Sequence, residues 1–246
     1  MQIKGAVALV TGAAKGIGYA FSEALLEHGA ASVRMLDISK QEGQKAQQQL
    51  ESKYGSGRAQ FDECDVTSKD DLTRCVKSVI TDHGKLDILC NNAGIVDEKN
   101  WERTIAINLN AVIQGTFLGM EVMNSGVIVN TGSMGGLAPM SLTPTYCASK
   151  HGVVGFTRSI APVAMKTKSI RVNAICPAFV ETPLLEKQKV DFPMAAGLVN
   201  HLGTVTSDFV AKGLIDIITD DKRIGDIMSI TAPDKMTYHQ SAISGF

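Results

Sequence analysis

The stretch ALVTGAAKGIGYAFSEALLEHG, residues 8–29, joins an apolar run to an amphipathic helix through a turn that contains Gly12, Gly16 and Gly18. Glycines at such positions allow a tight turn and let the backbone come close to a pyrophosphate. The helix that follows presents unpaired N–H groups and the positive end of its dipole to the same phosphates. The stretch therefore predicts a dinucleotide-binding turn between a first strand and a first helix. A purely structural turn is the alternative.

The rest of the chain repeats this alternation of apolar runs and amphipathic, helix-length segments. Several runs, such as AVALV and GVIVN, are almost continuously apolar, as strands covered on both faces are. Ser39 with Glu42 and Ser68 with Asp71 predict capping boxes at two helix starts. The alternation predicts a single α/β domain over residues 1–246, a Rossmann-type doubly wound parallel sheet of about seven strands with helices on both faces. The expected strands are Ala6–Thr11, Ser32–Asp37, Arg58–Asp62, Leu86–Asn91, Val127–Thr131, Arg171–Cys176 and Asp226–Thr231.

One segment, residues 182–206, departs from the alternation. Its helical signal is interrupted by Pro183, Pro193 and Gly197, and no strand follows at once. An insertion after a late strand of an open α/β sheet lies above the carboxyl edge, where ligands bind. We expect a substrate lid here, with a disordered surface loop as the alternative.

The composition limits the classes of partner. Of the 246 residues, 44% are hydrophobic and 20% are charged, values ordinary for a soluble globular protein. The net charge is −1 and the basic residues are scattered, which indicates no surface for nucleic acid or an anionic membrane. No apolar run approaches the length of about 18 residues that a membrane span needs.

The cysteines indicate the compartment. Their number is odd and no two form a C-x-x-C pair, which argues against a disulfide framework and against a zinc or other metal site. We expect buried free thiols in a reducing compartment. Because no basic segment and signal-type apolar run begins the sequence, the cytoplasm is the expected location. The five are Cys64, Cys75, Cys90, Cys147 and Cys176.

Asp37 bears on the choice of cofactor. It lies at the end of the second apolar run, 19 residues after Gly18. A carboxylate there accepts hydrogen bonds from the ribose hydroxyls of adenosine and repels a 2′-phosphate, which favours NAD over NADP. Lys15 argues mildly for NADP, because a cation beside the glycine turn can pair with a 2′-phosphate. The alternative is that Lys15 is a solvated side chain without a role in binding.

Further polar residues stand where later strands are expected to end. Asp65 follows the third strand and can bond the adenine amino group. Asn91–Gly94 ends the fourth, and Ser133 ends the fifth. The structural alternatives are a turn aspartate, an asparagine-rich turn and a helix-capping serine. Their convergence on one edge of one sheet favours a binding site.

Tyr146 and Lys150, in the stretch TPTYCASK, lie four residues apart on one face of an expected helix. For Tyr146 to act as a base near neutral pH, its pKa must fall from about 10 towards 7, which costs about 4 kcal/mol. A lysine cation about 4 Å away supplies about that much at an effective dielectric near 20. The positive nicotinamide of NAD+ would add to the effect. Ser133 can then orient and polarise the substrate oxygen.

These residues together resemble the short-chain dehydrogenase/reductase family. The resemblance is carried by T-G-x-x-x-G-x-G over Thr11–Gly18, the motif Asn91–Gly94, Asn108, Ser133 and Tyr146-x-x-x-Lys150. It implies that Tyr146 is the general acid/base, that Lys150 lowers its pKa and binds the nicotinamide ribose, that Ser133 holds the substrate oxygen, and that Asn108 supports a water relay. The expected cofactor contacts are Gly12, Lys15, Gly16, Ile17, Gly18, Asp37, Ile38, Cys64, Asp65, Val66, Asn92, Ala93, Gly94, Tyr146 and Lys150, to which the resemblance adds Pro177, Val180 and Thr182.

Longer stretches, among them EKNWERTIAINL and NAICPAFVETP, are similar to family members that oxidise a secondary allylic alcohol on a lipid mediator of the prostaglandin type with NAD. Two positions depart from the pattern. Ala178 stands where the family commonly has glycine, which stiffens or shifts the loop expected at the nicotinamide. Thr143 stands where those members carry a substrate-contacting glutamine, so we expect Thr143 to contact the substrate together with Ser133 and Tyr146.

The leading hypothesis is an NAD-dependent oxidation of a secondary alcohol to a ketone, on a hydroxylated fatty acid of lipid metabolism. One alternative is a carbonyl reductase or dehydrogenase acting on another secondary alcohol or ketone. A more distant alternative is a module that binds NAD(H) without catalysis. The family resemblance also implies a homo-oligomer, a dimer or a tetramer, formed through the helices that carry Asn108 and Tyr146.

Overall fold

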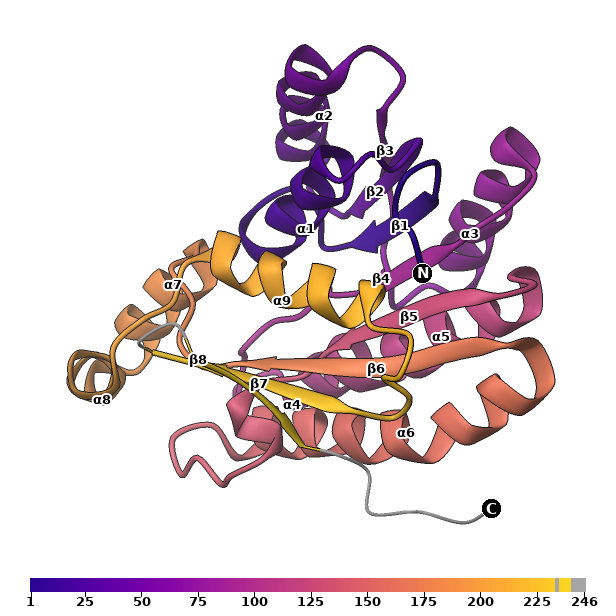
Figure 1. The fold of residues 1–246 in the computed structure, drawn as a ribbon. Helices are drawn as coiled ribbons and strands as arrows, with labels where there is room; N and C mark the ends of the chain where they lie inside the picture. The colour runs from indigo at the N-terminus through magenta and orange to yellow at the C-terminus, as the bar shows by residue number, and fades with distance from the viewer. Residues whose placement is uncertain (233–234, 240–246) are drawn as a thin grey trace.

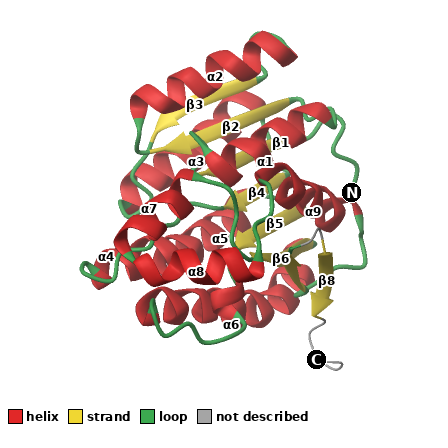
Figure 2. Cartoon of the chain, turned by 90° about the vertical axis from the view of Figure 1, so that its left-hand side faces the viewer, coloured by secondary structure: helices red, strands yellow, loops and turns green. Residues whose placement is uncertain are grey.

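A twisted eight-stranded sheet runs through the middle of the molecule, with helices on both faces (Figures 1 and 2). The computed structural model describes residues 1–232 and 235–239, so the expected domain, 1–246, extends beyond the described residues. The strand order is β3-β2-β1-β4-β5-β6-β7-β8, and every neighbouring pair is parallel except β7 with β8. The strands are β1 Val7–Thr11, β2 Ser32–Asp37, β3 Ala59–Glu63, β4 Ile88–Asn91, β5 Gly126–Thr131, β6 Ile170–Pro177, β7 Ile227–Thr231 and β8 Lys235–His239.

The doubly wound parallel sheet predicted from the sequence is confirmed. All seven expected strands are present within two residues at each end. The additional strand, β8, pairs antiparallel with β7 and covers its edge. Its sequence, KMTYH, carries no continuous apolar run, because one side of the strand is exposed. An apolar run signals a strand buried on both faces, and an edge strand of this kind does not have one.

The helices form one layer on each face of the sheet. Helices α1 and α9 pack against each other on one face, and α3, α5 and α6 lie together on the other (Figure 1). The most apolar strands, β1 and β4, are sealed between these two layers. The helices are α1 Gly16–Glu27, α2 Lys40–Tyr54, α3 Lys69–His83, α4 Trp101–Ile105, α5 Ala111–Val122, α6 Pro144–Lys168, α7 Pro183–Asp191, α8 Pro193–Leu202 and α9 Ser207–Thr219, with a π turn η1 at Ala106–Asn110 and a 3-10 turn η2 at Met134–Gly136.

The two expected capping boxes have different outcomes. Ser68 precedes α3, and its hydroxyl accepts a hydrogen bond from the Asp71 N–H at 3.2 Å. The prediction for Ser39 is wrong, although α2 begins directly after it. Ser39 makes no side-chain bond to the helix; its backbone N–H donates instead to the Asp37 carboxylate at 2.9 Å.

The continuous helix Trp101–Val122, formed by α4, η1 and α5, is long and apolar enough by composition to cross a membrane. One side of it belongs to the core, and 39% of its most apolar stretch is buried. Ile107 and Leu118 pack into the core between the sheet and α3, and Thr116 is buried and hydrogen-bonded to the Asn130 side chain.

The five cysteines are all free and buried, as the sequence predicted. The segment 182–206 folds into two ordered helices, α7 and α8. Pro183 and Pro193 occupy their first turns, where the missing proline N–H has no intrahelical partner to lose. The prolines therefore start two helices, and the alternative of a disordered loop is wrong.

Candidate functional site

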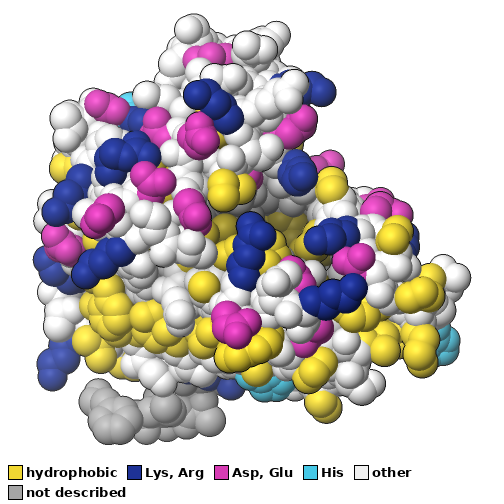
Figure 3. Space-filling view, turned by 180° about the vertical axis from the view of Figure 1, so that it is seen from behind, with side chains coloured by type: hydrophobic (Ala, Val, Ile, Leu, Met, Phe, Trp, Pro, Cys, Tyr) yellow, Lys and Arg dark blue, Asp and Glu magenta, His cyan; other side chains and the backbone are white. Residues whose placement is uncertain are grey.

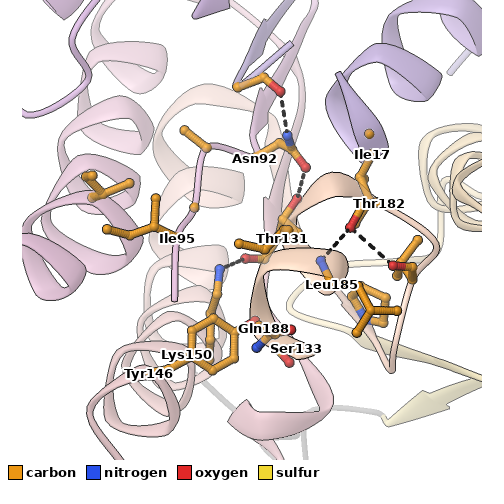
Figure 4. Close-up of a pocket in the computed structure, with 18 of the residues that line it drawn as sticks. Ile17, Asn92, Ile95, Thr131, Ser133, Tyr146, Lys150, Thr182, Leu185 and Gln188 are labelled. Atoms are coloured by element: carbon orange, nitrogen blue, oxygen red, sulfur yellow. Dashed lines mark hydrogen bonds between the residues drawn. The ribbon is translucent and has the colours of Figure 1, made fainter. Parts of the chain in front are cut away.

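A cavity of about 970 Å³ opens at the carboxyl edge of the sheet, between the strand ends and the helices α7 and α8. Figure 3 shows this hollow from behind, and Figure 4 shows side chains that line it. All the expected cofactor contacts line it except Gly18, which lies behind the turn. The other residues that line it include Ile95, Arg103, Ile107, Thr131, Met134, Met140, Ala178, Phe179, Leu184, Leu185, Gln188, Leu198 and Leu202.

The glycine turn is built by close backbone contact. Gly12 and Gly16 have φ values of +64° and +59°, a region that glycine enters readily. A Cβ on Gly12 would stand 2.8 Å from the Ala93 Cα, and one on Gly18 would overlap the Gly12 carbonyl oxygen. The three glycines are therefore required by the packing of the turn against α1 and the end of β4.

The start of α1 is open toward the cavity. No side chain caps it and its first turn contains no acidic residue. Its leading N–H groups therefore have no intrahelical partner and no competing anion. Asp37 stands beside this turn, and its carboxylate accepts hydrogen bonds from Ala14 N at 3.0 Å and Ser39 N at 2.9 Å. Lys15 is exposed, and Ile38, also at the rim, is 57% exposed.

The asparagine and serine at the strand ends have structural roles and line the cavity as well. Asn92 Nδ2 donates to the Thr11 carbonyl at 3.0 Å and its Oδ1 accepts from Thr131 Oγ1 at 3.2 Å, which ties β1 to β5 (Figure 4). Ser133 caps η2 through a bond from Gly135 N. The structural alternative is therefore present at both sites without excluding a ligand.

Asp65 also has a structural role and lines the cavity. Its Oδ1 accepts hydrogen bonds from the backbone N–H and the hydroxyl of Thr67, at 2.9 and 2.7 Å, as a turn aspartate does. Cys64, Asp65 and Val66 line the end of the cavity next to Asp37. The second carboxylate oxygen of Asp65 has no hydrogen-bond partner among the described residues.

Tyr146 and Lys150 project from the first turns of α6 into the cavity beside Ser133 (Figure 4). Lys150 Nζ donates to the Thr131 carbonyl at 2.7 Å and lies 5.8 Å from the centre of the Tyr146 ring. Burial raises the pKa of Tyr146 to about 12, against the lowering effect of a hydrogen bond with Ser133. Burial also lowers the pKa of Lys150 to about 8. The lowering of the Tyr146 pKa therefore comes from Ser133 in the protein alone, and Lys150, from which we expected it, is not among the causes.

Asn108 lies behind this pair, in the π turn η1. Its Oδ1 accepts from Ile95 N at 2.9 Å, and its Nδ2 donates to Ile95 O and to Ser149 Oγ. It is fully buried and does not line the cavity. A Cβ on Gly94 would lie 3.4 Å from Asn108 Oδ1 and 3.6 Å from Lys150 Nζ, so both side chains converge on this glycine.

The chain after β6 passes along the cavity without strain. The Ala178 N–H donates to the Ile230 carbonyl at 2.8 Å, and among the described non-glycine residues only Ser169 has a positive φ. Alanine therefore fits this loop. Thr182 caps α7: its Oγ1 accepts from Leu185 N and donates to the Val180 carbonyl (Figure 4).

Thr143 does not line the cavity. It is 3% exposed, it precedes α6, and its hydroxyl has no hydrogen-bond partner. The polar side chain that α7 brings to the cavity is Gln188, drawn near Ser133 in Figure 4. The sequence analysis missed Gln188. Its signal was the spacing of Leu184 and Gln188, which places them on one face of α7.

Comparisons with known proteins identify the family of the chain. The model of the short chain dehydrogenase family matches residues 6–191. The 15-hydroxyprostaglandin dehydrogenase [NAD(+)] of Rattus norvegicus is 44% identical over 248 residues, which cover 94% of this chain and 93% of that protein. The protein of the same name from Mus musculus is 42% identical over 260 residues, covering 99% and 96%. Among solved structures, levodione reductase has a TM-score of 0.85 at 25% identity, covering 93% of this chain and 96% of that one.

Proposed function

The chain belongs to the short-chain dehydrogenase family, and on that premise we propose that it oxidises a secondary alcohol to a ketone with NAD, on a hydroxylated lipid of the 15-hydroxyprostaglandin type. The observation that carries the proposal is the placement of Ser133, Tyr146 and Lys150 in one cavity with the open start of α1 and Asp37.

The residues at the turn fit a dinucleotide. An uncapped helix start without acidic residues suits a pyrophosphate, and the glycines leave no side chain between the backbone and the phosphates. Asp37 keeps a carboxylate at the cavity while holding the turn, which suits ribose hydroxyls and disfavours a 2′-phosphate. Pro177, Val180 and Thr182 line the cavity where we expect the nicotinamide end of the cofactor to bind.

The proposed chemistry begins with the substrate hydroxyl held by Ser133. NAD+, held by the glycine turn and Asp37, would accept the hydride from the carbon that bears the hydroxyl group, and would bring a positive charge beside the phenol. Tyr146, as the phenolate, takes the hydroxyl proton. Lys150 stabilises the phenolate by its charge. Asn108 holds the loop that contains Gly94 and Ile95 through its hydrogen bonds with Ile95. Because the pKa of Tyr146 is raised to about 12 without cofactor, chiefly by burial, we propose that positive charge at the site favours the phenolate.

The proposed substrate class is supported by the lining of the cavity. Met134, Met140, Phe179, Leu184 and Leu198 contribute apolar surface to it, and Gln188 contributes a polar group. Such a surface suits an aliphatic chain that carries a hydroxyl group. The helices α7 and α8 form the proposed substrate lid.

The test is a panel of hydroxylated lipids and simple secondary alcohols, with NAD and NADP, measured by the appearance of NADH or NADPH. We expect Tyr146→Phe to keep NAD affinity and lose turnover at least about 100-fold. Tyr19→Phe, on α1 and outside the cavity, should match the wild type. Absence of NADH with every alcohol contradicts the proposed reaction, and turnover by Tyr146→Phe contradicts the role of the phenol.

We also propose a homo-oligomer assembled through α5 and α6. Phe117 on α5 and Val163 on α6 are 53% and 49% exposed, and Phe117 packs edge-on against Phe156 of α6. Light scattering after size-exclusion chromatography tests it, with Phe117→Lys expected to yield monomers. The buried free thiols support a location in the cytoplasm, which fractionation of cells that express the protein would test.

A further inference from the structure

The helix that carries Tyr146 and Lys150 begins without a cap of its own. Thr143, the residue before it, makes no side-chain bond to the first turn. Pro144 has no N–H, so Thr145 and Tyr146 carry the first backbone donors that need a partner. Leaving buried donors unpaired is costly, so the acceptors must come from another part of the chain.

Glu98 supplies both acceptors. Its Oε2 accepts from Thr145 N at 3.0 Å and its Oε1 accepts from Tyr146 N at 2.8 Å. A carboxylate at a helix N-terminus also interacts favourably with the helix dipole, and charge-assisted hydrogen bonds are stronger than neutral ones. A residue 48 positions upstream thus holds the backbone of Tyr146 itself.

The loop that presents Glu98, residues 95–98, is fixed at both of its ends. At one end Ile95 exchanges two backbone hydrogen bonds with the Asn108 side chain. At the other, the Asp97 carboxylate accepts from Lys99 N and from Asn100, and hydrogen bonding to Asn100 holds the pKa of Asp97 below its usual range. Glu98 is therefore a fixed support for α6.

We propose that Glu98 is a positioning residue for the reaction: by clamping the first turn of α6 it sets the place of the Tyr146 phenol relative to Ser133. The inference rests on the proposed role of Tyr146. Glu98 does not line the cavity, so it acts through α6 and not by contact with the substrate.

The main test replaces Glu98 by glutamine, which keeps the size but removes one acceptor and the charge. We expect Glu98→Gln to lower kcat about tenfold, equivalent to about 1.4 kcal/mol, with the Kd for NAD changed less than about twofold. Glu98→Asp, which keeps the charge, should recover part of the loss. Lys99→Ala, at an exposed neighbour whose side chain makes no hydrogen bond or ion pair among the described residues, should match the wild type. An unchanged kcat in Glu98→Gln overturns the proposal, as does a loss of NAD affinity equal to the loss of kcat.

Hydrogen exchange separates this proposal from the proposed function. In the cofactor-free protein, the amides of residues 145–150 should exchange faster in Glu98→Gln than in the wild type, and at the wild-type rate in Lys99→Ala. Exchange that is unaltered in Glu98→Gln overturns the clamp whether or not the protein turns over. A wild-type protein without turnover that shows the faster exchange in the variant overturns the proposed function and supports the clamp.

Discussion

The two walls of the cavity are built in different ways. The cofactor wall consists of the ends of β1, β2 and β4 and the first turn of α1, where backbone lies against backbone: a Cβ on Gly12 would stand 2.8 Å from the Ala93 Cα. The lid wall consists of α7 and α8, where a Cβ on Gly197 would meet nothing within 4 Å, and Met194 is 76% exposed. The apolar side chains of this wall gather at the right of Figure 3. At Gly12 and Gly18 the cofactor wall has no space for a side chain, whereas at Gly197 the lid wall has such space.

The largest effect is expected on the cofactor wall, at Gly18. Gly18→Ala places a methyl group against the Gly12 carbonyl and 2.6 Å from Asn92 Nδ2. Overpacking of this kind costs about 1–3 kcal/mol, which predicts a Kd for NAD raised about 5- to 150-fold. Quenching of the fluorescence of the single tryptophan, or calorimetry, measures it. Gly155→Ala, where a Cβ meets nothing within 4 Å, is the matched control. Wild-type affinity in Gly18→Ala would show that the two walls do not differ.

On the lid wall, Gln188→Leu removes a polar side chain and leaves the apolar lining. Losing one uncharged hydrogen bond, about 0.5–1.5 kcal/mol, predicts kcat/KM for the alcohol lowered about two- to tenfold. The Kd for NAD should stay unchanged. Lys187→Gln, exposed on the same helix and away from the cavity, is the control. A parallel loss of NAD affinity would mean that α7 also belongs to the cofactor wall.

Between the walls, Lys150 predicts a pH dependence of stability. Burial lowers its pKa to about 8 in the folded state, below the value of about 10.4 in an unfolded chain. Between these values the unfolded chain binds more protons, so the free energy of unfolding rises with pH, by at most about 1.4 kcal/mol per pH unit. This contribution is present above the unfolded value and is lost as pH falls to about 8. Urea unfolding of the cofactor-free wild type should show this slope relative to Lys150→Met, and equal slopes would contradict the assignment.

The smallest effect is expected at Gly197 in the middle of α8. Its φ is not in the left-handed region and its Cβ position is open, so Gly197→Ala should raise the free energy of unfolding by about 0.4–1 kcal/mol. Turnover should change less than about twofold. Thermal unfolding checks the first statement and NADH formation the second. A destabilised Gly197→Ala would mean that α8 packs more tightly than its exposure indicates.

The same contrast explains what could be predicted from the sequence. The seven strands and the glycine turn could be predicted by local rules, because apolar runs and glycine positions are properties of short stretches. The strand β8 was missed because one of its sides is exposed, and Asp37 was assigned to a ligand without its structural bonds to Ala14 and Ser39.

The lid wall and the clamp depend on contacts between distant residues. Thr143 was expected at the substrate because similar family members carry a substrate-contacting glutamine at this position, yet in the structure its side chain is buried in the interior. Gln188 reaches the cavity through the placement of α7, and Glu98 reaches α6 across 48 residues. The spacing of Leu184 and Gln188 places them on one face of α7, but no short stretch of sequence specifies that this face meets the cavity or that Glu98 contacts α6.

The π turn at residues 106–110 makes the spacing of its residues as important as their identity. A π turn accommodates one more residue than the α-helix around it, and Asn108 lies at the middle of this one. Deleting a single residue from this turn would restore a regular helix and rotate everything on one side of it by about 100°. Such a deletion would move Asn108 away from Ile95, although all the side chains proposed to take part in the reaction would still be present. In this part of the molecule, we expect a change of length to be more damaging than most changes of residue.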